Sequence, residues 1–446
     1  MKSAILQQAS RLGAFAIASV AALNATALAQ DVSIEERLAA LEGQASGYVD
    51  NSYLFLIGGL IVMFMAAGFC CLEAGLVRSK NAAMQSMKNV ALFSVAGLMF
   101  WLVGYNMAYP GTTLLGGLVG IPDFIWSPEE SLDTGYSASS DWFFQMVFVA
   151  TAAAIVSGTV AERVKLWPFL AFTAVLTAFI YPIVASWEWG GGYLDSTWGF
   201  SDFAGSTLVH STGGWAALVG AIIIGPRTGK YFGKSINPMP GSNIPLAALG
   251  TFILWFGWFG FNGASQLAAG TFEDINAVAT IFANTNMAAV GGVLSAMILT
   301  SVLYKGKIDA TMVFNGAIGG LVSITAEPLA PSMGMSVAIG AIGGVLVVLT
   351  VPLLDKLKID DVVGAIPAHL VCGIWGTMIV PLSNGDANYI GQFVGVALTG
   401  IFVCAASAIV WTLLKVTVGV RVSEEEELAG LDKTEVGLEA YPEFSS

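Results

Sequence analysis

The chain has 446 residues, of which 56% are hydrophobic and only 11% charged, whereas soluble domains carry roughly 25% charged residues. Together with a mean hydropathy of +0.75, this composition argues against a soluble enzyme or a disordered chain and indicates a polytopic membrane protein. The net charge of −13 argues against a nucleic-acid partner, which would require a basic surface.

The N-terminal residues have the pattern of a secretory signal peptide. Their apolar run, residues 12–23, is shorter than the ~20 residues that cross a bilayer, which disfavours an uncleaved membrane helix. The small-x-small sequence at 27–29 supplies a cleavage site. We therefore expect removal of residues 1–29 and a periplasmic tail over 30–52. Within this tail, residues 33–43 have the spacing of a short amphipathic helix, but we favour a loose solvated turn.

Apolar segments of spanning length recur from residue 53 to residue 418, the expected membrane domain, and a tail of residues 419–446 follows. The eleven expected spans are residues 53–77, 89–109, 142–161, 166–186, 206–225, 244–262, 277–304, 311–326, 335–354, 362–382 and 390–418. A chain that starts outside and crosses eleven times ends in the cytoplasm.

Basic residues support this arrangement, because cytoplasmic loops carry an excess of Lys and Arg. Fifteen of the 18 Lys and Arg residues fall on the inner side. They are Arg78, Lys80, Lys88, Arg163, Lys165, Arg227, Lys230, Lys234, Lys305, Lys307, Lys356, Lys358, Lys415, Arg421 and Lys433. Two others are in the signal peptide, and only Arg37 lies outside. We expect a bacterial inner-membrane protein with a periplasmic N-terminus and a cytoplasmic C-terminus.

The only two histidines of the chain share a motif. His210 lies in DFAGSTLVHSTGGW and His369 in DVVGAIPAHLVCGIW, so the pattern D-x2-G-x4-H-x3-G occurs in the fifth and the tenth expected spans. Since the copies are five spans apart, an odd number, they run in opposite directions through the membrane, as in inverted-repeat transporters. The predicted fold is an all-α membrane protein with two five-helix inverted repeats, about 53–225 and 244–382, and a long eleventh helix.

Both histidines would lie at mid-membrane depth, where an ionisable residue is costly and suggests a function. A neutral imidazole offers one hydrogen-bond donor and one acceptor. Two such rings could line a narrow pore for ammonia or water without holding an ion. For either ring alone, a hydrogen bond within a helix interface is the plain alternative.

The chain resembles the ammonium transporter, methylammonium permease and Rhesus family over nearly all of residues 50–440. The motifs that carry the resemblance are DFAGSTLVH, AERVKLWPFLAF, WEWGGGYL, GWFGFNGAS, DDVVGAIPAHLVCGIWGT and RVSEEEELAGLD. The last motif favours the ammonium transporter branch. The resemblance implies a homotrimer with one ammonium or ammonia pore per subunit and methylammonium as an analogue. We expect no cofactor and no enzymatic activity, since the sequence offers no nucleophile–base pairing at a useful spacing.

For the outer end of the pore, the resemblance implies an ammonium recruitment site formed by Trp189, Phe148 and Ser265, near the acid Asp202. An aromatic face attracts a cation, and a hydroxyl accepts an N–H bond that potassium cannot donate. Plainer roles exist for each residue. Trp189 suits an interfacial anchor, Ser265 a helix cap, and Asp202 a cap whose carboxylate accepts free N–H groups.

Further in, the resemblance implies that Phe148 and Phe261 stack as a gate above the twin histidines His210 and His369. Paired phenyl rings make a hydrophobic constriction that opposes ions, although packing alone also explains them. The solute would pass as ammonia while its proton travels by a coupled route, so electrogenic uptake is expected.

Three further features stand beside the pore residues. Glu73 lies within the first span, where a carboxyl is expensive, so it serves either a proton route or a helix contact. Asp361, the counterpart of Asp202, is expected to be structural. The acidic run at 424–427 is expected to be solvated, although the resemblance implies that the tail contacts a neighbouring subunit and can meet a PII-type regulator.

Two alternative functions remain open from the sequence. An ammonium sensor would use the same fold and signal through its cytoplasmic tail, but the 28 residues after position 418 are few for a signalling domain. A membrane haem protein would use His210 and His369 as axial ligands, although haem-binding bundles more often carry histidine pairs on each of two helices.

Overall fold

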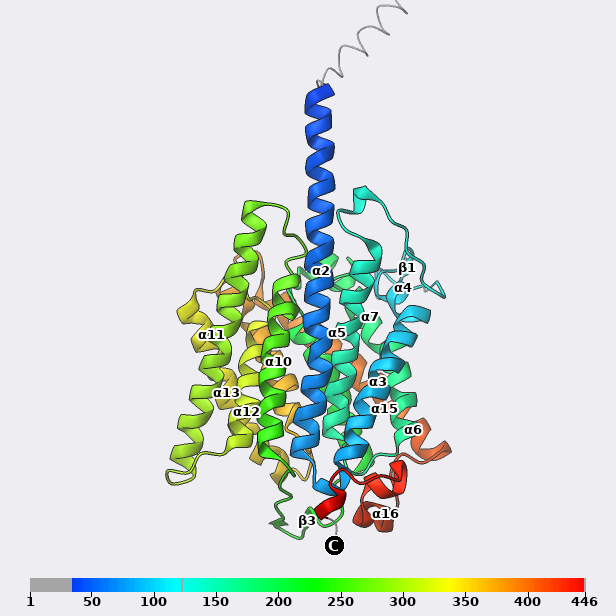
Figure 1. Ribbon diagram of the computed structural model, residues 1–446, viewed down its shortest axis with the longest axis vertical. Helices are drawn as coiled ribbons and strands as arrows, with labels where there is room; N and C mark the ends of the chain where they lie inside the picture. Colours follow the sequence, from blue (N-terminus) through cyan, green and yellow to red (C-terminus); the bar gives the residue numbers. More distant parts are fainter. Residues whose placement is uncertain (1–33, 122, 445–446) are drawn as a thin grey trace, which may run out of the picture.

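The computed structural model of the chain describes residues 34–121 and 123–444, with side chains described from residue 43 to residue 443. The predicted signal peptide, residues 1–29, lies outside the described residues. Helices form most of the described chain, as Figure 1 shows, because a backbone in lipid must satisfy its hydrogen bonds internally.

The elements follow one another along the chain with short connections. The α-helices are α2 (Ile34–Leu76), α3 (Ala82–Met99), α4 (Tyr105–Ala108), α5 (Ala138–Thr159), α6 (Leu166–Val175), α7 (Tyr181–Ser186), α8 (Tyr193–Trp198), α9 (Thr212–Ile224), α10 (Ile244–Ala264), α11 (Phe272–Leu303), α12 (Ala310–Ile324), α13 (Met333–Lys356), α14 (Cys372–Ile379), α15 (Tyr389–Thr417) and α16 (Glu424–Ala429). The π-helical segments are η2 (Phe100–Gly104), η4 (Leu176–Ile180), η5 (Ser206–Ser211), η6 (Ile366–Val371) and η8 (Asp432–Val436). The 3-10 turns are η1 (Ser79–Asn81), η3 (Leu132–Thr134), η7 (Val380–Leu382) and η9 (Pro442–Phe444).

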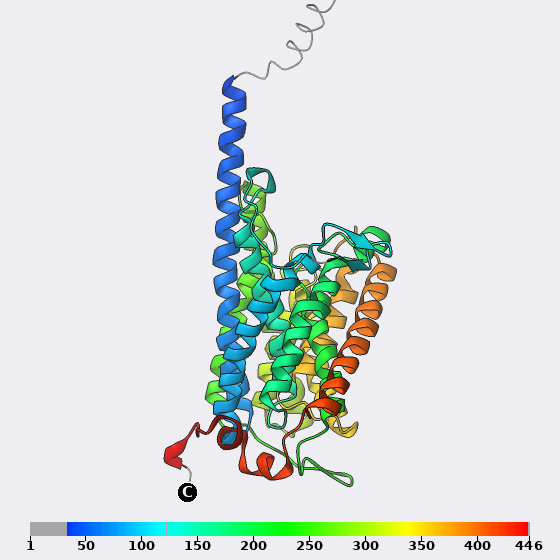
Figure 2. The same cartoon turned by 90° about the vertical axis from the view of Figure 1, so that its right-hand side faces the viewer.

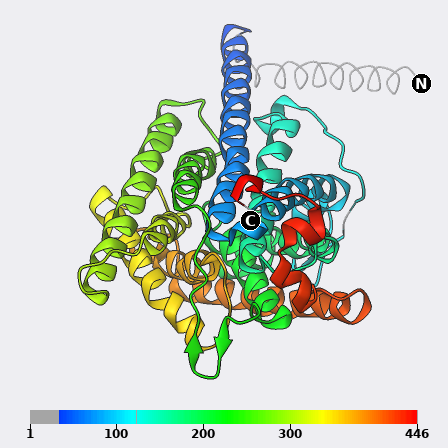
Figure 3. The same cartoon turned by 60° about the horizontal axis from the view of Figure 1, so that its bottom comes forward.

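Two small antiparallel hairpins complete the described structure. Strand β1 (Thr113–Leu114) pairs with β2 (Val119–Gly120), and β3 (Tyr231–Phe232) pairs with β4 (Ser235–Ile236). The β3–β4 hairpin lies at the same end of the bundle as α16, and we call this end the tail face (Figures 1 and 3). The opposite end carries β1, β2 and α8 and is called the far face; Tyr193 N donates to Gly117 O there at 3.3 Å.

Nine helical segments in the described ranges are long and apolar enough to cross a membrane. They are Gly43–Leu76, Ser79–Ala108, Ala138–Thr159, Leu166–Ser186, Ser206–Ile224, Ile244–Ala264, Phe272–Leu303, Met333–Lys356 and Tyr389–Thr417. Two shorter apolar helices, Ala310–Ile324 and Ile366–Leu382, coincide with the eighth and tenth expected spans. The helical membrane class is therefore confirmed, while the count of eleven spans stays a prediction.

The start of the first span differs from the expectation. Residues 34–43 form neither a separate short helix nor a turn, because α2 runs without a break from Ile34 to Leu76. At 1.5 Å per residue it is roughly 65 Å long, about twice the ~30 Å hydrocarbon core, and it rises beyond the bundle on the far face (Figures 1 and 2). A helix already formed in the span is extended at little cost, since only its nucleus is unfavourable.

Small residues allow the helices that surround the site to approach closely. A Cβ at Gly250 of α10 would lie 2.3 Å from Leu72 N of α2, and one at Gly75 of α2 would lie 2.6 Å from Ala247 N of α10. Neither position accepts a side chain without moving a backbone. Helix α2 is thereby held against α10, which carries part of the site.

The C-terminal tail is packed onto its own chain, contrary to the expectation that its acidic run is solvated. Glu424 and Glu425 are exposed, but Glu427 is buried. Its carboxylate accepts hydrogen bonds from Thr228 N at 2.6 Å and Thr228 Oγ1 at 3.0 Å, and it pairs with Arg421 at 2.7 Å. Glu426 also has a partner, because its Oε2 accepts Ser423 N at 2.7 Å in a capping box at the start of α16. Half of the run is therefore held by fixed contacts, and Glu427 is its buried member.

We expect Glu427→Ala to loosen the tail, because it leaves the Thr228 amide and the Arg421 guanidinium without this acceptor. Removing one partner of a buried pair costs about 3–5 kcal/mol in well-buried cases, and the partly exposed Arg421 places the loss below that range. Limited proteolysis of the purified protein should cut the tail several-fold faster, while the exposed control Glu425→Ala should match wild type. Equal cleavage rates in all three proteins would contradict this role of Glu427.

Candidate functional site: two histidines at the end of an aromatic series

The two histidine motifs fold into the same local structure. In each, a glycine with positive φ precedes a π-helical segment that carries the histidine. The glycines are Gly205 (φ +106°) before η5 and Gly364 (φ +79°) before η6, a conformation that suits a residue without a Cβ. Because π-helical segments are rare and concentrate at functional sites, the doubled sequence motif corresponds to a doubled and unusual backbone structure.

Asp202 caps the segment that carries the first histidine. Its Oδ1 accepts the N–H groups of residues 205 and 206 at 3.0 and 2.8 Å, and its Oδ2 accepts those of 207 and 208 at 2.7 and 2.9 Å. The carboxylate is fully buried. The expectation that Asp202 accepts free N–H groups at a helix start is confirmed, and this one side chain fixes the first turn of η5.

Asp361 caps the second segment with fewer bonds, as its expected structural role suggests. Its Oδ2 accepts Ile366 N at 2.8 Å, and its Oδ1 accepts Thr159 Oγ1 at 3.0 Å. Burial raises the pKa of Asp361, and these hydrogen bonds oppose the shift. Since Thr159 ends α5, Asp361 ties η6 to α5 on the tail face.

Aromatic rings form a continuous series from the far face to the first histidine. The Trp189 ring lies edge-on to Phe148 with centroids 6.1 Å apart, and Phe148 stacks on Phe261 at 3.9 Å. Phe261 is 5.2 Å from the His210 ring. Phe148 and Phe261 are buried, whereas Trp189 is partly exposed. The expected gate pair is therefore in stacking contact directly beside the first histidine.

The two histidines are in direct contact at the end of this series. Their Nδ1 atoms are 3.2 Å apart, so one ring donates and the other accepts a hydrogen bond. Nε2 of His210 is buried and has no hydrogen-bond partner among the described residues. This edge of the ring can therefore donate to, or accept from, a small polar solute, depending on the tautomer.

The same contact weighs against the haem alternative. Two axial ligands bind on opposite sides of the iron, whereas Nδ1 of His210 and Nδ1 of His369 already bond to each other and leave no space for a porphyrin. In the described part of the chain, no group of three or more His, Cys, Asp or Glu side chains is arranged to hold a metal ion.

Ser265 and Trp189 are joined to the series by hydrogen bonds to backbone. Ser265 is the C-cap residue of α10, and its Oγ donates to Phe261 O at 2.8 Å. Trp189 Nε1 donates to Asp202 O at 3.0 Å, which links the far-face aromatic ring to the cap of η5. Because its proton is used in this bond, the Ser265 oxygen keeps its lone pairs for an N–H donor.

Three residues that the sequence analysis did not single out also contact the site. The Trp258 ring stacks on the His210 ring with centroids 5.0 Å apart. The ring centroids of Phe69 and His369 are 6.0 Å apart. Glu188 Oε1 accepts a hydrogen bond from Asp202 N at 2.6 Å. Trp258 lies three residues before Phe261, and Glu188 directly precedes Trp189. Helical spacing from the recognised residues was the signal available for Trp258.

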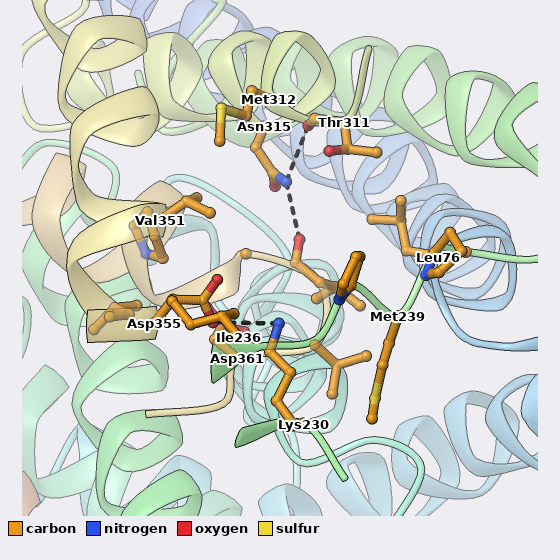
Figure 4. Close-up of a pocket in the computed structure, with 18 of the residues that line it drawn as sticks. Leu76, Lys230, Ile236, Met239, Thr311, Met312, Asn315, Val351, Asp355 and Asp361 are labelled. Atoms are coloured by element: carbon orange, nitrogen blue, oxygen red, sulfur yellow. Dashed lines mark hydrogen bonds and ion pairs between the residues drawn. The ribbon is translucent and has the colours of Figure 1, made fainter. Parts of the chain in front are cut away.

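A cavity of about 490 Å³ opens on the tail face, and we call it the vestibule (Figure 4). Its lining includes Asp361 and Pro367, the latter two residues before His369. Lys230 Nζ and Asp355 Oδ1 form an ion pair of 3.2 Å at its edge. The vestibule therefore extends from the tail face to the segment that carries the second histidine.

A buried charge network holds the wall of the vestibule. Arg227 pairs with Asp360 at 2.9 Å and with Glu162 at 3.1 Å. Burial alone would raise the pKa of Asp360, but the hydrogen bonds and charges of Arg227 and Arg163 hold it well below its usual range. Asp360 is therefore an anion at neutral pH and keeps Arg227 in place.

Comparison with known proteins assigns the family. The model of the Ammonium Transporter Family matches residues 53–441. The chain is 41% identical over 420 residues to the ammonium transporter Amt2 of Archaeoglobus fulgidus, covering 87% of each chain. It is 40% identical over 393 residues to a putative ammonium transporter of Synechocystis sp., covering 87% of this chain and 89% of the relative.

Solved structures agree with these sequence relationships. A protein described as a sensor Amt protein superposes with a TM-score of 0.81 at 36% identity, covering 87% of this chain and 98% of that chain. Mep2 of Candida albicans superposes with a TM-score of 0.76 at 25% identity, covering 86% of this chain and 88% of that chain. On the match over residues 53–441 and these identities, the chain belongs to the ammonium transporter family.

Proposed function

We propose that this protein transports ammonium across a membrane. Members of its family are membrane channels or transporters rather than enzymes, and the relatives compared above carry the name ammonium transporter. The single observation that carries the proposal is the buried His210–His369 contact at the end of the aromatic series. It combines a hydrophobic constriction with neutral hydrogen-bonding groups, a lining that suits ammonia better than a hydrated cation.

Recruitment takes place on the far face, at the mouth of the series. The Trp189 and Phe148 rings attract a cation, an interaction of about 0.5–2 kcal/mol depending on desolvation. The oxygen of Ser265 accepts an N–H bond, which distinguishes ammonium from potassium of similar size. The backbone carbonyl of Asp202 accepts a hydrogen bond from Trp189 Nε1, and this bond fixes the position of the mouth relative to η5.

Past the mouth, the stacked Phe148 and Phe261 rings separate the solute from water. Ammonium leaves its proton before this point, because cation–π attraction of about 0.5–2 kcal/mol is too weak to replace the hydration of a cation. Ammonia then hydrogen-bonds to the imidazoles and reaches the vestibule, while the proton moves by a coupled route. The uptake is consequently electrogenic.

The arrangement in the membrane follows from the same reasoning. The distribution of Lys and Arg places the tail face in the cytoplasm and the far face outside, in a bacterial inner membrane. Eleven spans, with 53–225 and 244–382 as inverted repeats, would place the histidines where the repeats meet. A homotrimer, and a PII-type regulator at the tail face, follow from the family resemblance.

A sensor role is the second proposal, favoured by the superposition on the sensor Amt protein. In a sensor the far-face site and the histidine pair would bind ammonium, and the packed tail would carry the signal. The two proposals differ in one observable quantity, since a pure sensor moves no solute across the bilayer.

The test is an electrical measurement on liposomes that contain the purified protein, adsorbed on a sensing electrode. A jump from zero to millimolar ammonium should give a saturable current, and a potassium jump should give none. A pH dye inside the liposomes reports neutral ammonia entry as alkalinisation. Silence in both assays, with protein-free liposomes as the baseline, would reject transport and favour the sensor.

A further inference from the structure

A buried carboxylate lies on the tail side of the histidine pair. Glu73, in the last turn of α2, is only 1% exposed. Its Oε2 accepts hydrogen bonds from Asn89 Nδ2 at 2.9 Å, from Ser157 Oγ at 2.9 Å and from Gln85 Nε2. Three neutral donors from α3 and α5 therefore hold one carboxylate oxygen in place.

The other oxygen, Oε1, has no hydrogen-bond partner among the described residues. A Cβ on Gly158 would lie 3.4 Å from it, so Oε1 points toward Gly158. Gly158, Glu73 and His369 all line one cavity of about 10 Å³, roughly the room that a single water-sized molecule needs. Glu73 and the second histidine thus line one cavity with room for a single small solute.

This small cavity lies next to the vestibule. Asn315 and Val363 line both, and Figure 4 shows Asn315 on the vestibule side, where its Nδ2 donates to Val363 O at 2.9 Å. A solute that leaves His369 toward the tail face therefore passes Glu73 before it reaches the vestibule.

We propose that Glu73 Oε1 is an inner subsite for the N–H donor that leaves the histidine pair. This inference rests on the proposed transport function and adds a residue to it. Buried hydrogen-bond acceptors almost always have a donor partner. Oε1 of Glu73 has a fixed orientation beside a space of about the size of ammonia, and a solute that enters this space supplies the missing donor. Once the solute has left the histidines, Oε1 of Glu73 is the acceptor that its N–H groups meet before the vestibule.

The decisive variant is Glu73→Gln, which has the same shape. Its amide oxygen faces the three donors, and its amide nitrogen replaces the free acceptor with a donor. We expect the maximal ammonium current to fall at least tenfold. The apparent KM for ammonium added outside should change less than threefold, because the far-face site is untouched. Trp189→Leu should show the opposite pattern, a raised KM with a smaller loss of maximal current.

Two further variants separate the subsite from a structural role. Glu73→Asp keeps a carboxylate and should recover part of the current that Glu73→Gln loses. Cys71→Ser, on another side of the same helix turn, should behave as wild type. If wild type carries current and folded Glu73→Gln keeps its maximal current, or if Glu73→Asp is as inactive as Glu73→Gln, the inference is wrong. If wild type itself shows no ammonium response, the proposed function fails first.

A measurement on the wild-type protein covers the case in which Glu73→Gln does not fold. Infrared difference spectra between ammonium and potassium should contain a carboxylate band that shifts with ammonium only and moves in Glu73→Asp. Absence of an ammonium-sensitive carboxylate band, or a band unaffected by Glu73→Asp, would overturn the assignment.

Discussion

Replacing both imidazoles, as His210→Ala with His369→Ala, should let potassium pass. The two rings contact each other, and each also lies against an aromatic ring, Trp258 for His210 and Phe69 for His369, so their removal widens the constriction. A wider constriction no longer excludes a hydrated cation by dewetting. The potassium current, absent in wild type, should reach at least a tenth of the ammonium current of the same variant.

The measurement is the ratio of potassium to ammonium currents on the same electrode. The single variants should give intermediate ratios, because one remaining ring still occupies part of the constriction. Trp258→Phe, which preserves an aromatic contact with His210, is the control for general loosening and should keep discrimination. A folded double variant that still discriminates fully between ammonium and potassium would falsify the pore-lining role.

Asp202→Ala should abolish ammonium transport. It leaves the four N–H groups of residues 205–208 without their acceptor. A buried unpaired donor costs about 1–3 kcal/mol, so the start of η5 must rearrange, and His210 lies on that segment. The bond from Trp189 to the Asp202 carbonyl couples the same change to the far-face mouth.

Asp361→Ala is the matched control for this prediction. Asp361 occupies the same position in the second motif. Its carboxylate accepts hydrogen bonds from Ile366 N and Thr159 Oγ1, whereas that of Asp202 accepts four from backbone N–H groups. We expect Asp361→Ala to lower the thermal stability less than Asp202→Ala does and to keep a residual ammonium current. Asp202→Asn should be intermediate, since its amide keeps one acceptor oxygen and turns a donor toward two N–H groups. Wild-type current in Asp202→Ala would contradict the role given to Asp202.

Much of the site could be recognised in the sequence because its signals are local. The D-x2-G-x4-H motif contains the capping aspartate, the positive-φ glycine and the histidine of each copy. In both copies these three residues form the same local structure, a capped π-helical segment that carries the histidine. Phe69 could not be recognised in this way, and Trp258 only through its helical spacing from Phe261. An aromatic residue on a membrane helix can face lipid, the protein core or a pore, and its residue type does not distinguish these positions. The rotation of α10 and α2 about their axes decides which surface each aromatic residue faces.

Glu73 and Glu427 illustrate the same limit for charged residues. The sequence places Glu73 in a membrane span, where the simplest expectation is a costly buried charge. It places Glu427 in an acidic run, where the simplest expectation is a solvated charge. Both are buried with fixed partners on other segments. Partners that lie far apart in the chain are brought together by packing, which no local pattern encodes.

By itself, the sequence determined the helical membrane class and the family, because hydropathy and contiguous motifs are local properties of the chain. It also pointed to the two histidine motifs and to candidate aromatic residues, although it missed Trp258, Phe69 and Glu188. Only the tertiary structure decided that His210 and His369, 159 residues apart, share a hydrogen bond. It also decided that Glu73 and His369 line the same small cavity. The physical reason is that side-chain distances and unpaired atoms depend on how whole helices pack, which is a property of the assembled bundle.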